Sequence, residues 1–123
     1  MPRLRQVRGV LAVNDLTTSV EFYRDRLGFK VDFEVSGWAF LSRDQVHLML
    51  GHCPAEVPAR NIHDHSWFAY ITVDAIDDLH RELAQRGVHP SRDLEDTPWG
   101  MREFTVTTPD GHRIVFGQEL GPA

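Results

Sequence analysis

The two halves of the chain repeat one pattern of apolar residues and turns. Residues 13–16 (Val-Asn-Asp-Leu) return 60 positions later as Val-Asp-Ala-Ile at 73–76, and Leu27-Gly28 returns 59 positions later as Arg86-Gly87. Two copies at so long a period indicate duplication of one supersecondary unit, because a solenoid needs three or more repeats. With 123 residues, the chain is therefore predicted to form one domain, residues 1–123, built from two similar modules.

Each half carries the signals of one strand, one helix and three further strands. The first helix is expected to be capped by Asp15 and to end at Gly28; the second is expected to be capped by Asp74 and to end at Gly87. Strands are expected at 7–13, 29–35, 38–42 and 46–50, and then at 67–73, 88–95, 101–107 and 113–118. The valine-rich run 7–13 favours a strand buried on both faces.

These signals predict the α+β class, with two tandem βαβββ modules forming a curved mixed sheet with a concave groove. The modules span approximately residues 5–51 and 66–119, and residues 52–65 form a linker rich in turn residues. Strand side chains alternate between two faces, so one face of each module packs under its helix and the other stays open. The predicted open faces mix aromatic, aliphatic and a few polar groups, which is typical of a ligand groove.

Charge and composition narrow the range of partners. Thirteen Lys and Arg against eighteen Asp and Glu give a net charge of -5, which argues against nucleic acid or an anionic membrane and favours a neutral or cationic ligand. The single cysteine, Cys53, excludes an intrachain disulfide and suits a reducing compartment. No apolar run approaches the roughly 20 residues of a membrane span. The N-terminus also lacks the apolar segment of a signal peptide. We therefore expect a cytoplasmic protein.

Two long motifs identify a family. The segments VEFYRDRLGFKVDFE at 20–34 and TPWGMREFTVTTPDGHRIVFGQE at 97–119, together with the duplication, resemble the glyoxalase, bleomycin-resistance and extradiol-dioxygenase superfamily over nearly the whole chain. The DRLGF run, the Asp32-Phe33 pair and the PWG-REF pattern are most similar to the bleomycin-binding resistance proteins. That resemblance implies a homodimer whose subunits form a cleft, where planar drug groups stack on aromatic side chains and acidic side chains meet a cationic tail.

The resemblance also allows a metal site to be checked position by position. Enzymes of the superfamily bind a divalent metal through His, Gln and Glu side chains, at positions that correspond here to Arg8, His47, Phe68 and Val115. Of these four, only the imidazole of His47 can ligate a metal, and a catalytic site needs about three protein ligands. The sequence therefore predicts no cofactor. The alternative is a divalent metal held by His47 with His63 and His65, whose H-x-H spacing suits an extended strand.

The candidate ligand-binding residues come from the aromatic and charged positions of the predicted groove. Trp99 lies between Pro98 and Gly100, where a large ring is expected to serve binding and not only the core. Phe33 and Phe104 can equally be core residues, and Arg102 and Glu103 must point to opposite faces. The full candidate set is Asp32, Phe33, Trp38, Phe40, His47, Phe68, Trp99, Arg102 and Phe104.

Three functions remain open at this point. The favoured hypothesis is a metal-free small-molecule binding protein of the bleomycin-resistance type, and not an enzyme, that sequesters an aromatic, cationic ligand in a groove at a homodimer interface. The second is a metal-dependent enzyme of the superfamily, such as a lyase, a dioxygenase or a fosfomycin-type transferase. The third is an orphan metabolite-binding module. The sequence leaves the ligand's identity, its affinity and any turnover undecided.

Overall fold

The computed structural model describes residues 1–121 and confirms the predicted α+β class. The first module contains β1 (Gly9–Val13), α1 (Leu16–Glu21), the π-helical turn η1 (Phe22–Arg26), β2 (Lys30–Val35), β3 (Trp38–Arg43) and β4 (Val46–His52). The second contains β5 (Trp67–Thr72), α2 (Ile76–Gln85), β6 (Arg92–Asp96), β7 (Met101–Thr107) and β8 (Arg113–Glu119). Two 3-10 turns, η2 (Ala59–Asn61) and η3 (His63–Ser66), lie in the connection between them.

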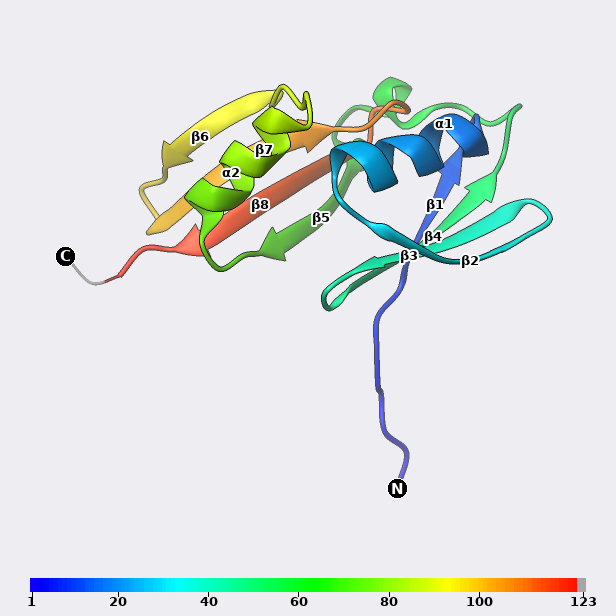
Figure 1. The fold of residues 1–123 in the computed structure, drawn as a ribbon, viewed down its shortest axis with the longest axis horizontal. Coiled ribbons are helices and arrows are strands. Elements are labelled where there is room, and N and C mark those ends of the chain that lie inside the picture. The colour runs from blue at the N-terminus through cyan, green and yellow to red at the C-terminus, as the bar shows by residue number, and fades with distance from the viewer. Residues whose placement is uncertain (122–123) are drawn as a thin grey trace.

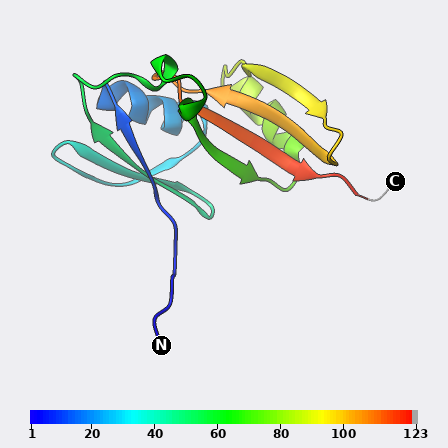
Figure 2. The same ribbon diagram turned by 180° about the vertical axis from the view of Figure 1, so that it is seen from behind.

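The two modules have the same sheet topology. Each forms a four-stranded sheet, in the orders β1-β4-β3-β2 and β5-β8-β7-β6. The pairs β1–β4 and β5–β8 are parallel and the other pairs are antiparallel. Both helices lie on the same side of the sheets, and the opposite side carries no helix (Figures 1 and 2). Each sheet therefore has one covered face and one open face.

The ends of the helices follow the predicted signals with one exception. Asp15 caps α1, because its carboxylate accepts the Thr18 backbone N–H at 3.1 Å. Gly28 and Gly87 take the left-handed conformation after the two helices, at φ +74° and +86°. The prediction that Asp74 caps α2 is wrong. Ala75, at φ 55°, is the N-cap residue, so α2 begins at Ile76, one residue too late for Asp74 to cap it. The side-chain oxygen of Gln118 accepts the Ile76 N–H instead.

The core joins the covered faces of both modules into one cluster. Tyr23 and Leu27 follow α1, and Ile76 and Leu83 belong to α2. The strands contribute Leu11, Val13, Ala39, Leu41, Leu48 and Leu50 from the first sheet and Phe104, Val106, Ile114 and Phe116 from the second. Burial of this continuous apolar surface is the main driving force that holds the two modules together.

The strand predicted at 7–13 differs from β1 in length and in burial. The strand begins at Gly9, and the segment that precedes it runs out from the body of the molecule to the N-terminus (Figure 1). Val10 is 59% exposed, whereas Leu11 and Val13 are buried. The expectation of burial on both faces is wrong for this chain, because α1 covers only one face of the sheet. Similarly, β6 begins at Arg92, four residues after the predicted start at Val88.

Within residues 1–121, no helix is both long enough and apolar enough to cross a bilayer.

Candidate functional site

The open face of the first sheet carries a row of exposed aromatic and aliphatic side chains. Phe33, Phe40 and Met49 are register partners across β2, β3 and β4, and the rings of Phe33 and Phe40 lie 5.6 Å apart. Phe33 is 56% exposed, and Val35 and Trp38 form the next exposed pair along the same strands. We call this surface, Val10, Phe33, Val35, Trp38, Phe40 and Met49, the first open face. A contiguous exposed apolar patch of this kind marks a binding or association surface.

A β-bulge places two neighbouring residues of β2 on this same face. The register of β2 against β3 shifts between Val31 and Phe33, so Asp32 is an extra residue without a direct partner. Its carboxylate accepts a hydrogen bond from Ser42 and pairs with Lys30 at 3.2 Å, and these contacts hold the pKa of Asp32 below its usual value. The charge of His47 lowers this pKa further. Asp32 is therefore an ionised group beside the aromatic row.

Arg8 lies at the edge of the first open face. Its guanidinium carbon is 5.4 Å from the centre of the Phe40 ring, a cation–π distance. The Nη1 atom is buried and has no hydrogen-bond partner among residues 1–121. An unpaired buried donor costs free energy, so a ligand acceptor that reached this nitrogen would gain a hydrogen bond there.

The open face of the second sheet is organised around Glu103. The Tyr70 hydroxyl donates to Oε2 of Glu103 at 2.7 Å, and the indole N–H of Trp99 donates to the same oxygen at 3.2 Å. Desolvation of the phenol, followed by the hydrogen bond and the negative charge of Glu103, raises the pKa of Tyr70 to about 12. Trp99 is 68% exposed despite this contact. The result is a carboxylate flanked by two aromatic rings.

A further aromatic residue extends this second open face. The guanidinium of Arg113 lies 3.8 Å from the centre of the Trp67 ring and is anchored by the Ser66 hydroxyl at 2.8 Å and by Asp64 at 3.1 Å. We call Trp67, Tyr70, Trp99 and Glu103 the second open face. Three of its members, Trp67, Tyr70 and Glu103, were not candidates from the sequence. Side-chain alternation along β5 and along β7 is the sequence signal that points to Tyr70 and Glu103.

Three candidate residues do not lie on the open faces. Phe68 is the extra residue of a bulge in β5, and its ring sits at the boundary between modules, where a Cβ on Gly9 would come within 2.5 Å of it. Arg102 faces the helix side, paired with Asp77 and Asp96. Phe104 is 1% exposed and stacks on Phe116 at 5.2 Å. Of the neighbours Arg102 and Glu103, it is Glu103 that lines the open face.

The residues at the four metal positions that the sequence resemblance implies do not fit a metal. Arg8 is a cation stacked on a ring, and Phe68 and Val115 have no donor atoms, so His47 stands alone. His63 and His65 lie in the 3-10 turn η3 and not on the extended strand that their H-x-H spacing suggested. In the part of the chain that the structure describes, no three His, Cys, Asp or Glu side chains come together as a ligand set.

Comparisons with known proteins converge on one family. A model of the Glyoxalase/Bleomycin resistance protein/Dioxygenase superfamily matches residues 4–116. Bleomycin resistance proteins of Geobacillus stearothermophilus and Staphylococcus aureus are each 31% identical to the chain, over 89% of this chain and 93% of theirs. The crystal structure of a bleomycin-binding protein from bleomycin-producing Streptomyces verticillus, complexed with copper(II)-bleomycin, is similar with a TM-score of 0.72 and 26% identity, covering 99% of this chain and 100% of that one.

Proposed function

Because the chain belongs to the glyoxalase/bleomycin resistance protein/dioxygenase superfamily, we propose that it binds and sequesters an antibiotic of the bleomycin type. The ligand class is an aromatic, cationic compound, held on the two open faces in a cleft between two copies of the chain. The protein acts in the cytoplasm as a binding protein and needs no metal of its own. The observation that carries this proposal is the placement of flat, exposed rings beside carboxylates on the open faces.

The aromatic side chains supply the stacking surface. All three tryptophans of the chain, Trp38, Trp67 and Trp99, belong to the open faces and are exposed. A well-oriented aromatic stack adds about 0.5 to 1.5 kcal/mol beyond the apolar area that it buries. Two such rings on either side of a planar heteroaromatic group therefore hold it in place without a covalent bond.

The carboxylates supply the complement to a cationic group. Both donors to Glu103, Tyr70 and Trp99, use the Oε2 atom. Among residues 1–121 no hydrogen bond to Oε1 of Glu103 is formed, so that oxygen can accept an ammonium of the ligand. The ring faces of Tyr70 and Trp99 add cation–π attraction at the same place. Asp32 provides a second ionised carboxylate on the other module, and the net charge of -5 favours the approach of a cation.

A second copy of the chain is proposed to cover the open faces. Each face exposes large apolar side chains, such as Phe33 on the first and Trp67 on the second, that a neighbouring subunit would bury. A homodimer with two-fold symmetry brings the same surface of both copies together, and two equivalent clefts result. The rings and the carboxylates then line a cavity that excludes water, where stacking and charge pairing are both stronger.

The test is a calorimetric titration of the full chain with metal-free bleomycin and with copper(II)-bleomycin, beside light scattering to measure the oligomeric state. We expect binding with a stoichiometry of one ligand per chain, quenching of tryptophan fluorescence and the mass of a dimer. Glu103→Gln should weaken binding, and Ile62→Ala, which truncates an exposed apolar residue of the linker, should not. A chain that shows no heat and no quenching with either form of the drug would rule out bleomycin as the ligand. Chemical change of the drug during the titration would contradict a role restricted to binding.

A further inference from the structure

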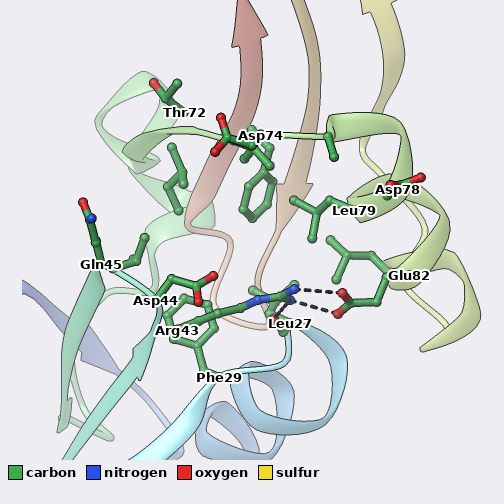
Figure 3. Close-up of a pocket in the computed structure, with 16 residues that line it drawn as sticks. Leu27, Phe29, Arg43, Asp44, Gln45, Thr72, Asp74, Asp78, Leu79 and Glu82 are labelled. Atoms are coloured by element: carbon green, nitrogen blue, oxygen red, sulfur yellow. Dashed lines mark hydrogen bonds and ion pairs between the residues drawn. The ribbon is translucent and has the colours of Figure 1, made fainter.

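A cavity of about 520 Å³ lies between the two modules on the side of the sheets that carries the helices (Figure 3). One wall is the turn between β3 and β4, residues 43–46, and the opposite wall is the segment from β5 to α2, residues 71–75. Pockets for small organic ligands have volumes of roughly 300 to 1,000 Å³. The open faces lie on the other side of the sheets, so this cavity is separate from the proposed antibiotic site.

The floor of the cavity is apolar. It is formed by core residues of both modules together with partly buried side chains around its mouth. The principal members are Leu27, Phe29, Val46, Ile71, Leu79 and Phe116. An apolar group that entered the cavity would contact both modules at once and would remove this surface from water.

The rim of the cavity is acidic. Four acidic residues are among those that line it, Asp44, Asp74, Asp78 and Glu82, against one arginine, Arg43. Arg43 is fully engaged at 2.8–2.9 Å with both oxygens of Glu82 and with the Leu27 carbonyl, as Figure 3 shows for the ion pair. The arginine therefore neutralises Glu82 and leaves the charge of the other carboxylates at the mouth.

Asp44 and Asp74 are the two rim carboxylates that the fold does not use elsewhere. Asp78 pairs with Arg81 at 2.8 Å, but among residues 1–121 neither Asp44 nor Asp74 forms an ion pair or a side-chain hydrogen bond. Asp74 does not cap α2, since Ala75 occupies the N-cap position. The two residues line the cavity from opposite modules, because Asp44 belongs to the β3–β4 turn and Asp74 follows β5 at the upper rim (Figure 3).

We propose that this inter-module cavity is a second ligand site, which takes a small organic cation with an apolar body. The apolar part of the ligand occupies the floor, and its ammonium lies at the rim between Asp44 and Asp74. Charge complementarity selects a cation over a neutral or anionic molecule of the same shape. Because the ligand contacts both modules, its binding stabilises their association and raises the unfolding temperature of the chain.

The experiment is an NMR titration of the full-length chain with three probes of one shape, namely 2-phenylethylammonium, 2-phenylethanol and 3-phenylpropionate. The ammonium should shift the backbone amides of residues 43–46 and 71–75, the alcohol should bind several-fold more weakly, and the carboxylate should not bind. A fragment of this size in a fitting pocket binds with a Kd of about 10 mM or tighter. An absence of shifts in these two segments at that concentration overturns the proposal.

Two double variants that remove the same charge from different places test whether the rim carboxylates select the cation. Asp44→Asn with Asp74→Asn should weaken binding of the ammonium by about five- to ten-fold and leave the alcohol unaffected, as expected for the loss of two partly screened charges. Glu34→Gln with Glu56→Gln removes the same charge from exposed positions outside the cavity and should change nothing. An equal loss of ammonium binding in the two double variants would overturn the proposal, because the net charge of the chain alone would then explain the effect. Trp99→Ala should leave probe binding unchanged, so this site and the proposed antibiotic site succeed or fail separately.

Discussion

Arg43 and Glu82 form a two-pronged ion pair across the boundary between the modules. The Nη2 and Nη1 atoms of Arg43, at the end of β3, donate to the two carboxylate oxygens of Glu82 on α2 at 2.8 and 2.9 Å. Arg43 also donates to the Leu27 carbonyl at 2.9 Å, near the end of the first helical segment. Paired geometry of this kind is more specific and stronger than a single contact. It ties the turn that follows β3 to the helix of the other module.

This ion pair makes stability depend on pH in a defined direction. The hydrogen bond from Arg43 is the largest cause that lowers the pKa of Glu82 below its ordinary value of 4.5. A carboxyl group with a lowered folded-state pKa stabilises the fold above its unfolded pKa, and this contribution disappears as pH falls through the folded pKa. Glu82→Gln should therefore reduce the free energy of unfolding at pH 7, by about 1 kcal/mol or less because the pair is partly exposed.

The measurement is urea unfolding of both proteins between pH 7 and acid. The difference between them should shrink once the pH is below 4.5 and should vanish where Glu82 is protonated in the folded state. A difference that stays constant through this range would mean that Glu82 acts by packing and not by charge.

Substitutions at Trp99 and at Phe104 should have opposite effects on ligand binding and on stability. Trp99 is largely exposed, so Trp99→Ala should weaken ligand binding while it changes the unfolding temperature little. Phe104→Leu should do the reverse, because this buried ring stacks on Phe116 and meets the His80 ring at 5.2 Å on the helix side. Calorimetric titration and thermal unfolding of both variants give the comparison. A larger stability loss in Trp99→Ala than in Phe104→Leu would identify Trp99 as a core residue.

The duplication could be predicted because both halves keep the same order of turn residues, and the strand alternation because it depends on local periodicity. The covered set Leu48 and Leu50, the outward set His47 and Met49, and the helix ends at Gly28 and Gly87 follow from side-chain alternation and from the need for positive φ. Each of these features is decided within a few residues of the chain, where a single sequence carries enough information.

The bulges and the cross-strand contacts could not be predicted from local sequence patterns. One added residue in β5 turns Phe68 from the open face to the module boundary, and one added residue in β2 puts Asp32 beside Phe33. The Glu103 contacts require the position of the Trp99 loop over β7 together with the packing of β5 beside β8. Such relations depend on register and tertiary packing, and for that reason the sequence pointed to Trp99 but not to its acceptor.

Tyr70 should titrate far above an ordinary tyrosine. Its pKa is raised to about 12 by desolvation and by Glu103, so the folded state favours the neutral phenol. A group with a raised folded-state pKa contributes stability that is complete below its unfolded pKa of 10.0 and is lost as pH rises through the folded value. Ultraviolet absorbance of the phenolate, compared between the parent chain and Tyr70→Phe, gives the titration of this one residue.

Glu103→Gln is the matched variant for that titration. It keeps an acceptor for Tyr70 and for Trp99 but removes the negative charge, so the pKa of Tyr70 should fall toward 10 and stop short of it, because the desolvation remains. If the titration of Tyr70 is unchanged by Glu103→Gln, the charge of Glu103 does not act on the phenol and the proposed cation site loses one of its supports.

Asp110 is a buried carboxylate that fastens the second module to the first. It lies in the turn between β7 and β8, is 6% exposed, and accepts the Asn14 backbone N–H at 3.2 Å and the Ser19 hydroxyl at 3.4 Å. Asp110→Ala leaves both donors without a partner in a buried place and should cost about 1 to 3 kcal/mol of stability. Asp110→Asn keeps the shape of the side chain and one acceptor oxygen, so it should lose less stability. Ser19→Ala removes only the longer contact and should lose the least stability. Chemical unfolding of the three variants tests this order. If Ser19→Ala cost as much stability as Asp110→Ala, the contact of Asp110 with the Asn14 backbone would contribute nothing at this point of the junction, and the Ser19 contact would account for the whole effect of Asp110.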